Sequence, residues 1–155
     1  MHTYKDPFLN PVSTLLEPRP WQVDKMKQAV TLLTRYDDYR AFCKSPNIYQ
    51  HTRCRITAAN LWMNATGDRL RFQISADRFL GRMVRLLVGK LIGIGSGTLS
   101  VNEFESYFIE KNTPARWDPA YPQGLFLSNV NYPYLKQPAR TDFDTVHHTA
   151  SWIPL

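Results

Sequence analysis

The stretch from Arg78 to Gly97, RFLGRMVRLLVGKLIGIGSG, constrains the fold of this chain more than any other. On a helix of about 3.6 residues per turn, its apolar residues cover a broad arc, while Arg78, Arg82 and Arg85 fall on one narrow stripe. An apolar arc of this width is typical of a helix that packs against a sheet. The pattern therefore predicts a core helix whose arginines lie along one edge of the packing, within reach of an anion.

The segments around this helix predict an α+β domain. Apolar residues at helical spacing in WQVDKMKQAVTLLTRY predict a helix that ends near Tyr36. β-Branched and aromatic residues alternate with polar ones around the turn NATGD, which predicts paired strands at about 53–63 and 69–75. Ser100 with Glu103 three residues later predicts a capped helix, and QGLFLSNVNYP predicts a last strand. We expect helices packed on one face of a mainly antiparallel sheet.

The two ends of the chain lack such periodicity. Residues 1–20 hold four prolines and predict an extended arm or linker. Residues 135–155 are polar and aromatic without a clear period, which predicts an irregular tail. The domain itself is expected over residues 21–134, because a chain of 155 residues is long enough for one domain with a real core.

Charge and cysteine content narrow the class of protein. Lys and Arg number 19 against 13 for Asp and Glu, a net charge of +6, which favours nucleic acid or an anionic surface as a partner. The longest apolar segment, 86–94, contains Lys90 and is far shorter than a membrane span of about 20 residues. The first residues show no charged, apolar and small-residue series in turn, so no secretory leader is expected. Cys43 and Cys54 have neither metal-site spacing nor the density of a disulfide scaffold. We therefore expect a reduced, cytoplasmic protein.

Few residues carry a pattern that indicates catalysis. The glycines of GIGSG follow a helix instead of preceding one, so they indicate a helix-ending loop and not a phosphate cradle. His147 and His148 have no carboxylate or thiol at ligand spacing, so no metal site is expected. The basic residues around the predicted hairpin and helix are candidates for RNA contacts, with nearby aromatic side chains for stacking, although for any one of them a solvated surface is the favoured interpretation. These basic residues are Lys5, Arg53, Arg55, Arg78, Arg82 and Arg116, and the aromatic ones are Tyr4, Tyr36, Tyr39, Phe42 and Tyr49.

Arg85 differs from the other basic residues because it lies in the most apolar part of the chain. A partly buried guanidinium needs a carboxylate or phosphate partner, so we expect one beside it. The available carboxylates are Asp37, Asp38, Asp77 and Asp118, and no pattern distinguishes one of them as this partner.

Five ordered segments resemble bacterial tRNA pseudouridine synthase A. FLGRMVRLLVGKLIGIGSG is similar to the signature F-x-x-x-MVRN-x-VG-x-L-x-x-VG-x-G, and DPAYPQGLFLSNVNYP to the terminal APA-x-GL-x-L-x-x-V-x-YP. HTYKDPFLNP is similar to the link into the family's second half, YDDYRAFCKS to G-x-HDF-x-x-F, and TRCRI to the stretch before its hairpin. The resemblance covers residues 1–133. The chain departs from the family at Leu86, which replaces the asparagine of MVRN, and in FCKSPNIYQ, where the family has F-S-K-x-H-x-x.

The resemblance implies the fold and the activity of this family's second half. The family isomerises uridine to pseudouridine in the anticodon arm of tRNA, without a metal or organic cofactor, as a homodimer whose subunits hold two ferredoxin-like α+β halves around a cleft. An aspartate of the first half starts the chemistry on a flipped base. Arg85 matches the arginine that pairs with this aspartate, and Leu125 matches the leucine that lines the base pocket. The chain alone is expected to be inactive and to need a separate first half.

The tail contains ARTDFDTVHHTA, which is similar to the RTD-x-GVHA motif of the family's first half. Asp142 matches the aspartate of this motif and is a candidate nucleophile. The stretch has one more residue before the valine and lacks the glycine, so a chance match is the competing interpretation. Three hypotheses follow for the chain. It is the C-terminal half of a tRNA pseudouridine synthase, a non-catalytic basic RNA-binding module, or an interaction protein that self-associates through an exposed cleft face.

Overall fold

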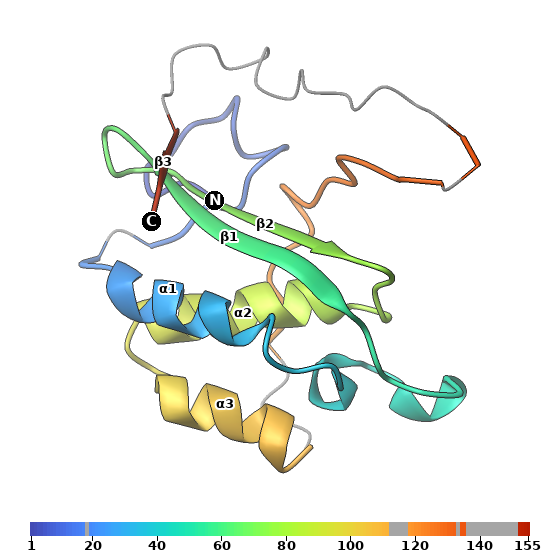
Figure 1. The fold of residues 1–155 in the computed structure, drawn as a ribbon. Helices are drawn as coiled ribbons and strands as arrows, with labels where there is room; N and C mark the ends of the chain where they lie inside the picture. Colours follow the sequence, from blue (N-terminus) through green and yellow to red (C-terminus); the bar gives the residue numbers. More distant parts are fainter. Residues whose placement is uncertain (18, 112–117, 133, 136–151) are drawn as a thin grey trace.

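A computed structural model of the chain describes residues 1–17, 19–111, 118–132, 134–135 and 152–155. In this part of the chain, a three-stranded antiparallel sheet of order β2-β1-β3 packs on helices (Figure 1). The strands are β1 (Ile56–Asn64), β2 (Leu70–Ala76) and β3 (Trp152–Pro154). The helices α1 (Val23–Leu32) and α2 (Met83–Gly95) lie side by side under one face of the sheet, and α3 (Val101–Ile109) lies below them (Figure 1). The predicted α+β class is confirmed.

The β1–β2 hairpin has the predicted strands, each displaced by no more than a few residues. The pairs Ala59–Ile74 and Leu61–Phe72 belong to the hydrophobic core, whereas the pair Trp62–Arg71 points to the opposite face of the sheet. This alternation is the period-2 pattern that the sequence shows. The turn is closed by Asn64, whose side-chain oxygen accepts the backbone N–H groups of Asp68 and Arg69.

The core below the sheet is centred on an aromatic cluster. Phe42 lies in a short 3₁₀ helix, η1 (Arg40–Phe42), and its ring lies 4.7 Å from that of Phe108 and 5.6 Å from that of Phe104. Tyr39 and Phe42 are fully buried. The expectation that these two side chains stack on bases is therefore wrong, because both rings are buried in the packing between η1 and α3.

The helix of the opening argument begins later than predicted. It starts at Met83, and Arg82 before it has a left-handed backbone with a φ of 63°. Arg78 and Arg82 thus lie in the loop from β2 to α2, and only Arg85 lies on the helix. The loop is fixed by Tyr49, whose hydroxyl accepts the N–H of Gly81 at 3.0 Å and whose ring lies under the Arg78 guanidinium. The predicted arginine stripe is therefore wrong. Tyr49, the C-cap of the short 3₁₀ helix η2 (Pro46–Ile48), comes from a distant loop and holds the residues before Met83 out of the helix.

Both ends of the described chain are more ordered than the sequence suggests. Residues 1–17 are not an unpacked arm, since His2, Leu9 and Leu16 are buried and residues 1–3 pair with the outer edge of the hairpin. Within the predicted irregular tail, the described residues 152–154 form the strand β3, which pairs with β1. By contrast, the predicted strand at 123–133 does not form in the described part of that segment. The only pairing of its described residues is an isolated bridge between Tyr132 and Leu135. Asp142, His147 and His148 lie outside the described residues.

Candidate functional site

Arg85 lies in the first turn of α2 and is partly buried. Its Nε donates a hydrogen bond of 2.7 Å to the carbonyl oxygen of Ala120. The Arg85 carbonyl in turn accepts the backbone N–H of Ala120 at 2.9 Å. Among the described residues, the guanidinium forms no ion pair and its two terminal nitrogens have no hydrogen-bond partner. Within that part of the chain, the partner of Arg85 is thus a backbone carbonyl and not the carboxylate that we expected.

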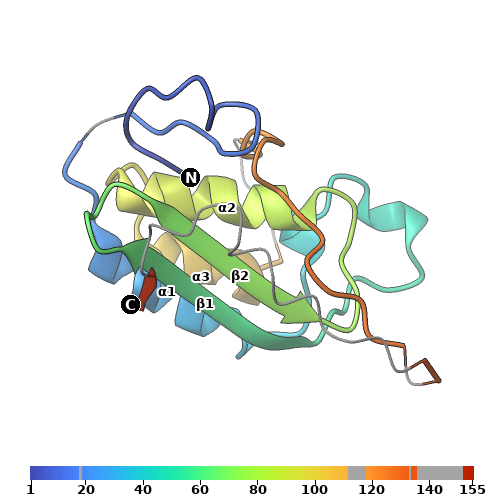
Figure 2. The same cartoon turned by 90° about the horizontal axis from the view of Figure 1, so that it is seen from above.

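Leu125 lies on the segment that Arg85 contacts. This segment, residues 118–132, crosses α2, continues past Ala120 and extends beyond the C-terminal end of β2 (Figure 2). The Thr14 hydroxyl donates to the Gln123 carbonyl at 2.7 Å and ties the segment to the N-terminal residues. Beyond that tie the apolar side chains face solvent, and they include Leu125 at 50% exposure, Phe126, Leu127 and Val130. The structure thus places Leu125 on the segment that Arg85 contacts at Ala120, and the outer part of this segment is apolar and exposed.

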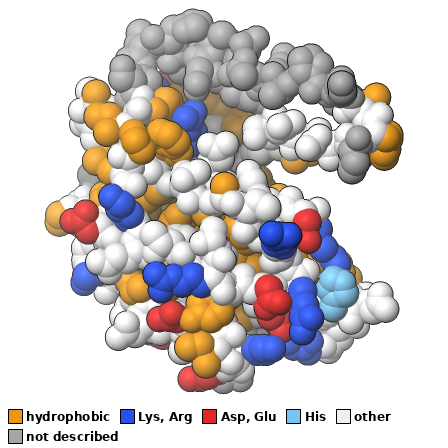
Figure 3. Space-filling model, viewed as in Figure 1, with side chains coloured by type: hydrophobic (Ala, Val, Ile, Leu, Met, Phe, Trp, Pro, Cys, Tyr) orange, Lys and Arg blue, Asp and Glu red, His pale blue; other side chains and the backbone are white. Residues whose placement is uncertain are grey.

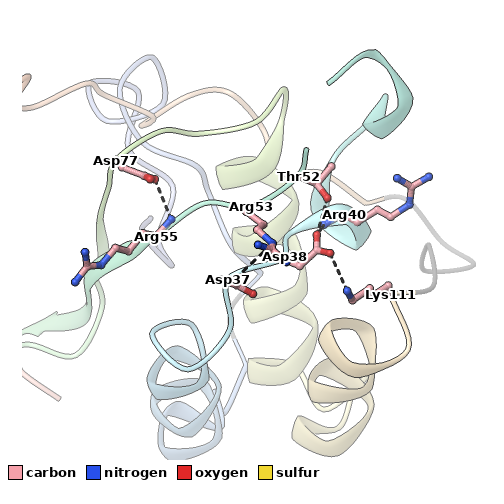
Figure 4. A network of polar contacts seen from close by, with 8 residues as sticks. All are labelled: Asp37, Asp38, Arg40, Thr52, Arg53, Arg55, Asp77 and Lys111. Carbon is pink, nitrogen blue, oxygen red and sulfur yellow. Dashed lines mark hydrogen bonds and ion pairs between the residues drawn. The ribbon is translucent and has the colours of Figure 1, made fainter. Parts of the chain in front are cut away.

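Three of the four candidate carboxylates make local contacts instead of approaching Arg85 (Figure 4). Asp37 lies 3.8 Å from Arg53 at the surface. Asp77 accepts the backbone N–H of Arg55 at 2.9 Å. These two aspartates stabilise the entry into the hairpin.

Asp38 is the most enclosed of these three aspartates. Its carboxylate accepts hydrogen bonds from the Thr52 hydroxyl at 2.5 Å and the Arg40 backbone N–H at 3.1 Å, and it lies 3.0 Å from the Lys111 ammonium (Figure 4). Burial raises the pKa of this carboxyl, but the hydrogen bonds from Thr52, Lys111 and Arg40 outweigh burial and hold the pKa below its usual value. Asp38 therefore joins the ends of α1 and α3 to the residues before β1, and it is a structural group.

The basic side chains are spread over the molecule. Figure 3 shows Lys and Arg side chains mixed with acidic ones over the end that carries η1 and η2, and further Lys and Arg side chains on the opposite side of the same face. Arg53 and Arg55 alternate with the buried Cys54 in the extended chain before β1 and are exposed, as is Arg82. Arg78 is half-buried against Tyr49. Lys5 is exposed in the N-terminal segment, and Arg116 lies outside the described residues.

The described residues also bear on metal binding and on membrane insertion. These residues contain no group of three or more His, Cys, Asp or Glu side chains that could hold a metal ion. None of the helices in the described part of the chain is long and apolar enough to cross a membrane.

Comparison with known proteins identifies the family. A sequence model of the tRNA pseudouridine synthase family matches residues 29–133. The chain belongs to this family. This confirms the resemblance seen in the ordered motifs, and it places α2, with Arg85, and the crossing segment with Leu125 inside the matched region.

Individual relatives show how much of the family's length is present. The chain is 35% identical over 129 residues to tRNA pseudouridine synthase A of Porphyromonas gingivalis, a match that covers 83% of this chain and 51% of the relative. It is 36% identical over 114 residues to the Bacteroides fragilis protein of that name, with 74% and 45% covered. The Synechococcus protein is 30% identical over 146 residues, with 92% and 49% covered. The chain thus spans about half the length of the curated relatives it matches.

Two residues at this site were not predicted from the sequence. Ala120 holds Arg85 through backbone atoms, and a backbone contact leaves no side-chain signal in a sequence. Gly89 lies beside the crossing segment, and its ideal β-carbon would collide with the Asp118 carbonyl. The glycine of MVRN-x-VG was the available signal, because a glycine inside an otherwise apolar helix indicates a close approach of backbone.

Proposed function

We propose that this chain supplies the second half of a tRNA pseudouridine synthase that isomerises uridine to pseudouridine in the anticodon arm of tRNA. One observation carries the proposal. Arg85 is partly buried and held by its Nε, while its terminal nitrogens have no partner among the described residues. A guanidinium in this state is suited to a bidentate pair with a carboxylate, and the family's catalytic aspartate is such a group.

In this function Arg85 pairs with an aspartate of a first half. The charge of the guanidinium lowers the pKa of a neighbouring carboxyl, so it keeps the aspartate ionised and ready to act on the base. Leu125 is proposed to line the base pocket, where an apolar wall excludes water from the flipped uridine. No metal or organic cofactor takes part in the proposed reaction. The assembled enzyme is proposed to be a homodimer, as the family resemblance implies.

The exposed basic residues are proposed to contact the tRNA backbone. Arg53, Arg55 and Arg82 present exposed guanidinium groups at one end of the molecule, with Arg78 beside them on Tyr49. Lys5 and Arg116 are proposed to extend this surface. Contacts of this kind release counterions, so tRNA binding should weaken steeply as the salt concentration rises.

The test measures tritium release from tRNA labelled at uridine C5. The chain is assayed alone and after mixing with a separately expressed first half of the Porphyromonas gingivalis relative, which supplies the RTD-x-GVHA motif. We expect no release by the chain alone, release by the mixture, and loss of that release in Arg85→Gln but not in the surface control Arg35→Gln, an exposed arginine outside the proposed tRNA surface. Release by a mixture that contains Arg85→Gln, at the rate of the unmodified chain, would exclude the proposed role of Arg85.

The same assay separates the other hypotheses. Release by the chain alone would place a nucleophile within it, and its loss in Asp142→Asn would identify the tail motif as the source. Salt-dependent tRNA binding without release in the mixture would favour a non-catalytic RNA-binding module. A salt-independent dimer in light scattering, with no affinity for tRNA, would favour an interaction protein.

A further inference from the structure

We propose that Gly89 and Ala120 position Arg85, because they let the chain cross α2 closely enough to clamp that arginine from its own backbone. The crossing, and not the helix alone, then sets the direction in which the guanidinium presents its terminal nitrogens. The catalytic importance of this positioning rests on the proposed function. The clamp itself is a property of the folded chain.

The crossing at Gly89 is closer than any side chain allows. A β-carbon built on Gly89 would lie 1.8 Å from the carbonyl oxygen of Asp118, 3.0 Å from its carbonyl carbon and 3.3 Å from the nitrogen of Ala120. These three atoms belong to backbone, so no rotation of a side chain relieves the collision. Glycine is the residue that permits such an approach. Any other residue at position 89 must push residues 118–120 away from the helix.

The same crossing holds Arg85 at two points. Arg85 precedes Gly89 by four residues, so the two lie one above the other on the same face of α2. The Ala120 N–H donates to the Arg85 carbonyl at 2.9 Å, and the Ala120 carbonyl accepts from Arg85 Nε at 2.7 Å. The guanidinium is planar, so fixing Nε also fixes the plane of the terminal nitrogens. A displacement of residues 118–120 at Gly89 therefore releases Arg85 at both points.

Gly93 offers a matched control on the same helix. It lies one turn after Gly89, and its β-carbon would lie 3.4 Å from the Leu99 β-carbon and 3.4 Å from the Thr98 hydroxyl oxygen. That is ordinary van der Waals distance. Gly89→Ala and Gly93→Ala thus make the same chemical change in the same helix, but only the first collides with backbone.

The experiment follows the Arg85 Nε–H proton by ¹⁵N NMR. Its exchange with water is measured in the unmodified 155-residue chain, in Gly89→Ala and in Gly93→Ala, with the exposed Arg53 Nε–H as an internal reference. In the unmodified chain we expect the Arg85 proton to exchange at least roughly tenfold more slowly than that of Arg53, as one maintained hydrogen bond implies. Gly89→Ala should abolish this difference, and Gly93→Ala should keep it within about twofold.

Each outcome decides the proposal. Equal exchange of the Arg85 and Arg53 protons in the unmodified chain would overturn it, and this comparison does not depend on whether a variant folds. A protected Arg85 proton in a folded Gly89→Ala chain would overturn the role of Gly89. The measurement needs neither tRNA nor a first half, so a confirmed clamp together with absent isomerisation would count against the proposed function alone. If both hold, Gly89→Ala should lower kcat of the assembled enzyme while KM for tRNA stays unchanged.

Discussion

Removal of the Asp38 carboxylate should loosen the junction between the helices and the hairpin. The Asp38 side chain is 19% exposed and accepts from a hydroxyl, a backbone N–H and an ammonium group. Thr52 is buried, so Asp38→Ala leaves its hydroxyl unsatisfied at a cost of about 1–2 kcal/mol. Loss of the bond to Arg40 adds about 0.5 kcal/mol, and the pair with the half-exposed Lys111 adds about 0.5 kcal/mol or less.

The expected cost of Asp38→Ala is therefore about 1.5–3 kcal/mol of unfolding free energy. For a chain of this length it lowers Tm by about 3–12 °C. Asp38→Asn keeps one oxygen for Thr52 and Arg40 and loses only the charge, so it should cost about 1 kcal/mol. Lys111→Ala is the matched control and should cost less than either. The assay is urea unfolding followed by tryptophan fluorescence at pH 7.

The pH dependence of this effect has a defined sign. Because the pKa of Asp38 in the folded chain is lower than its usual value of about 3.9, its charge stabilises the fold fully above that value. The contribution is lost as the pH falls through the lowered pKa. The difference in unfolding free energy between the unmodified chain and Asp38→Asn should therefore shrink as the pH falls from about 5 to about 2, the range over which this carboxyl takes up its proton. A difference that stays constant, or a Lys111→Ala cost equal to that of Asp38→Ala, would refute this account of the junction.

Three other predictions concern the core, a helix cap and the basic surface. Phe42→Ala should cost about 3–5 kcal/mol because its ring is fully buried, and a cost below about 1.5 kcal/mol in urea unfolding would argue against the packing described. Ser100→Ala removes the hydroxyl that accepts the Glu103 N–H in the first turn of α3 and should cost about 1 kcal/mol. Its control Ser106→Ala, in the body of that helix, should change stability by less than about 0.5 kcal/mol, and equal costs would contradict the cap. Arg53→Gln and Arg55→Gln should each lower the slope of log affinity for tRNA against log salt by about 0.9, and an unchanged slope would remove that residue from the interface.

Local patterns predicted much of this fold. The hairpin was predictable because its strands alternate apolar and polar residues and its turn carries an Asn and a Gly. The cap of α3 was predictable because Ser100 and Glu103 are close in sequence, and the Ser100 hydroxyl does accept the Glu103 N–H. The family was predictable because the motifs follow one another in a fixed order. All of these signals come from residues that lie near one another along the chain.

Other features depended on residues far apart in the sequence. The start of α2 was mispredicted because Tyr49 holds the preceding loop, and helical periodicity contains no information about a hydroxyl from another loop. The segment at 123–132 has the side chains of a strand, but in the described residues it pairs with none of the strands β1, β2 and β3. Pairing depends on where the path of the chain brings a segment relative to a sheet edge, and the alternation of side chains contains no information about that path.

The sequence by itself determined the α+β class, the hairpin, the helices apart from the exact start of α2, and that Arg85 is a partly buried cation within one of these helices. Only the tertiary structure decided what holds that cation. Its partner is a backbone carbonyl of Ala120, brought across α2 because Gly89 lacks a side chain. A contact between backbone and side chain thirty-five residues apart depends on the path of the chain in space, and no periodicity or composition records that path.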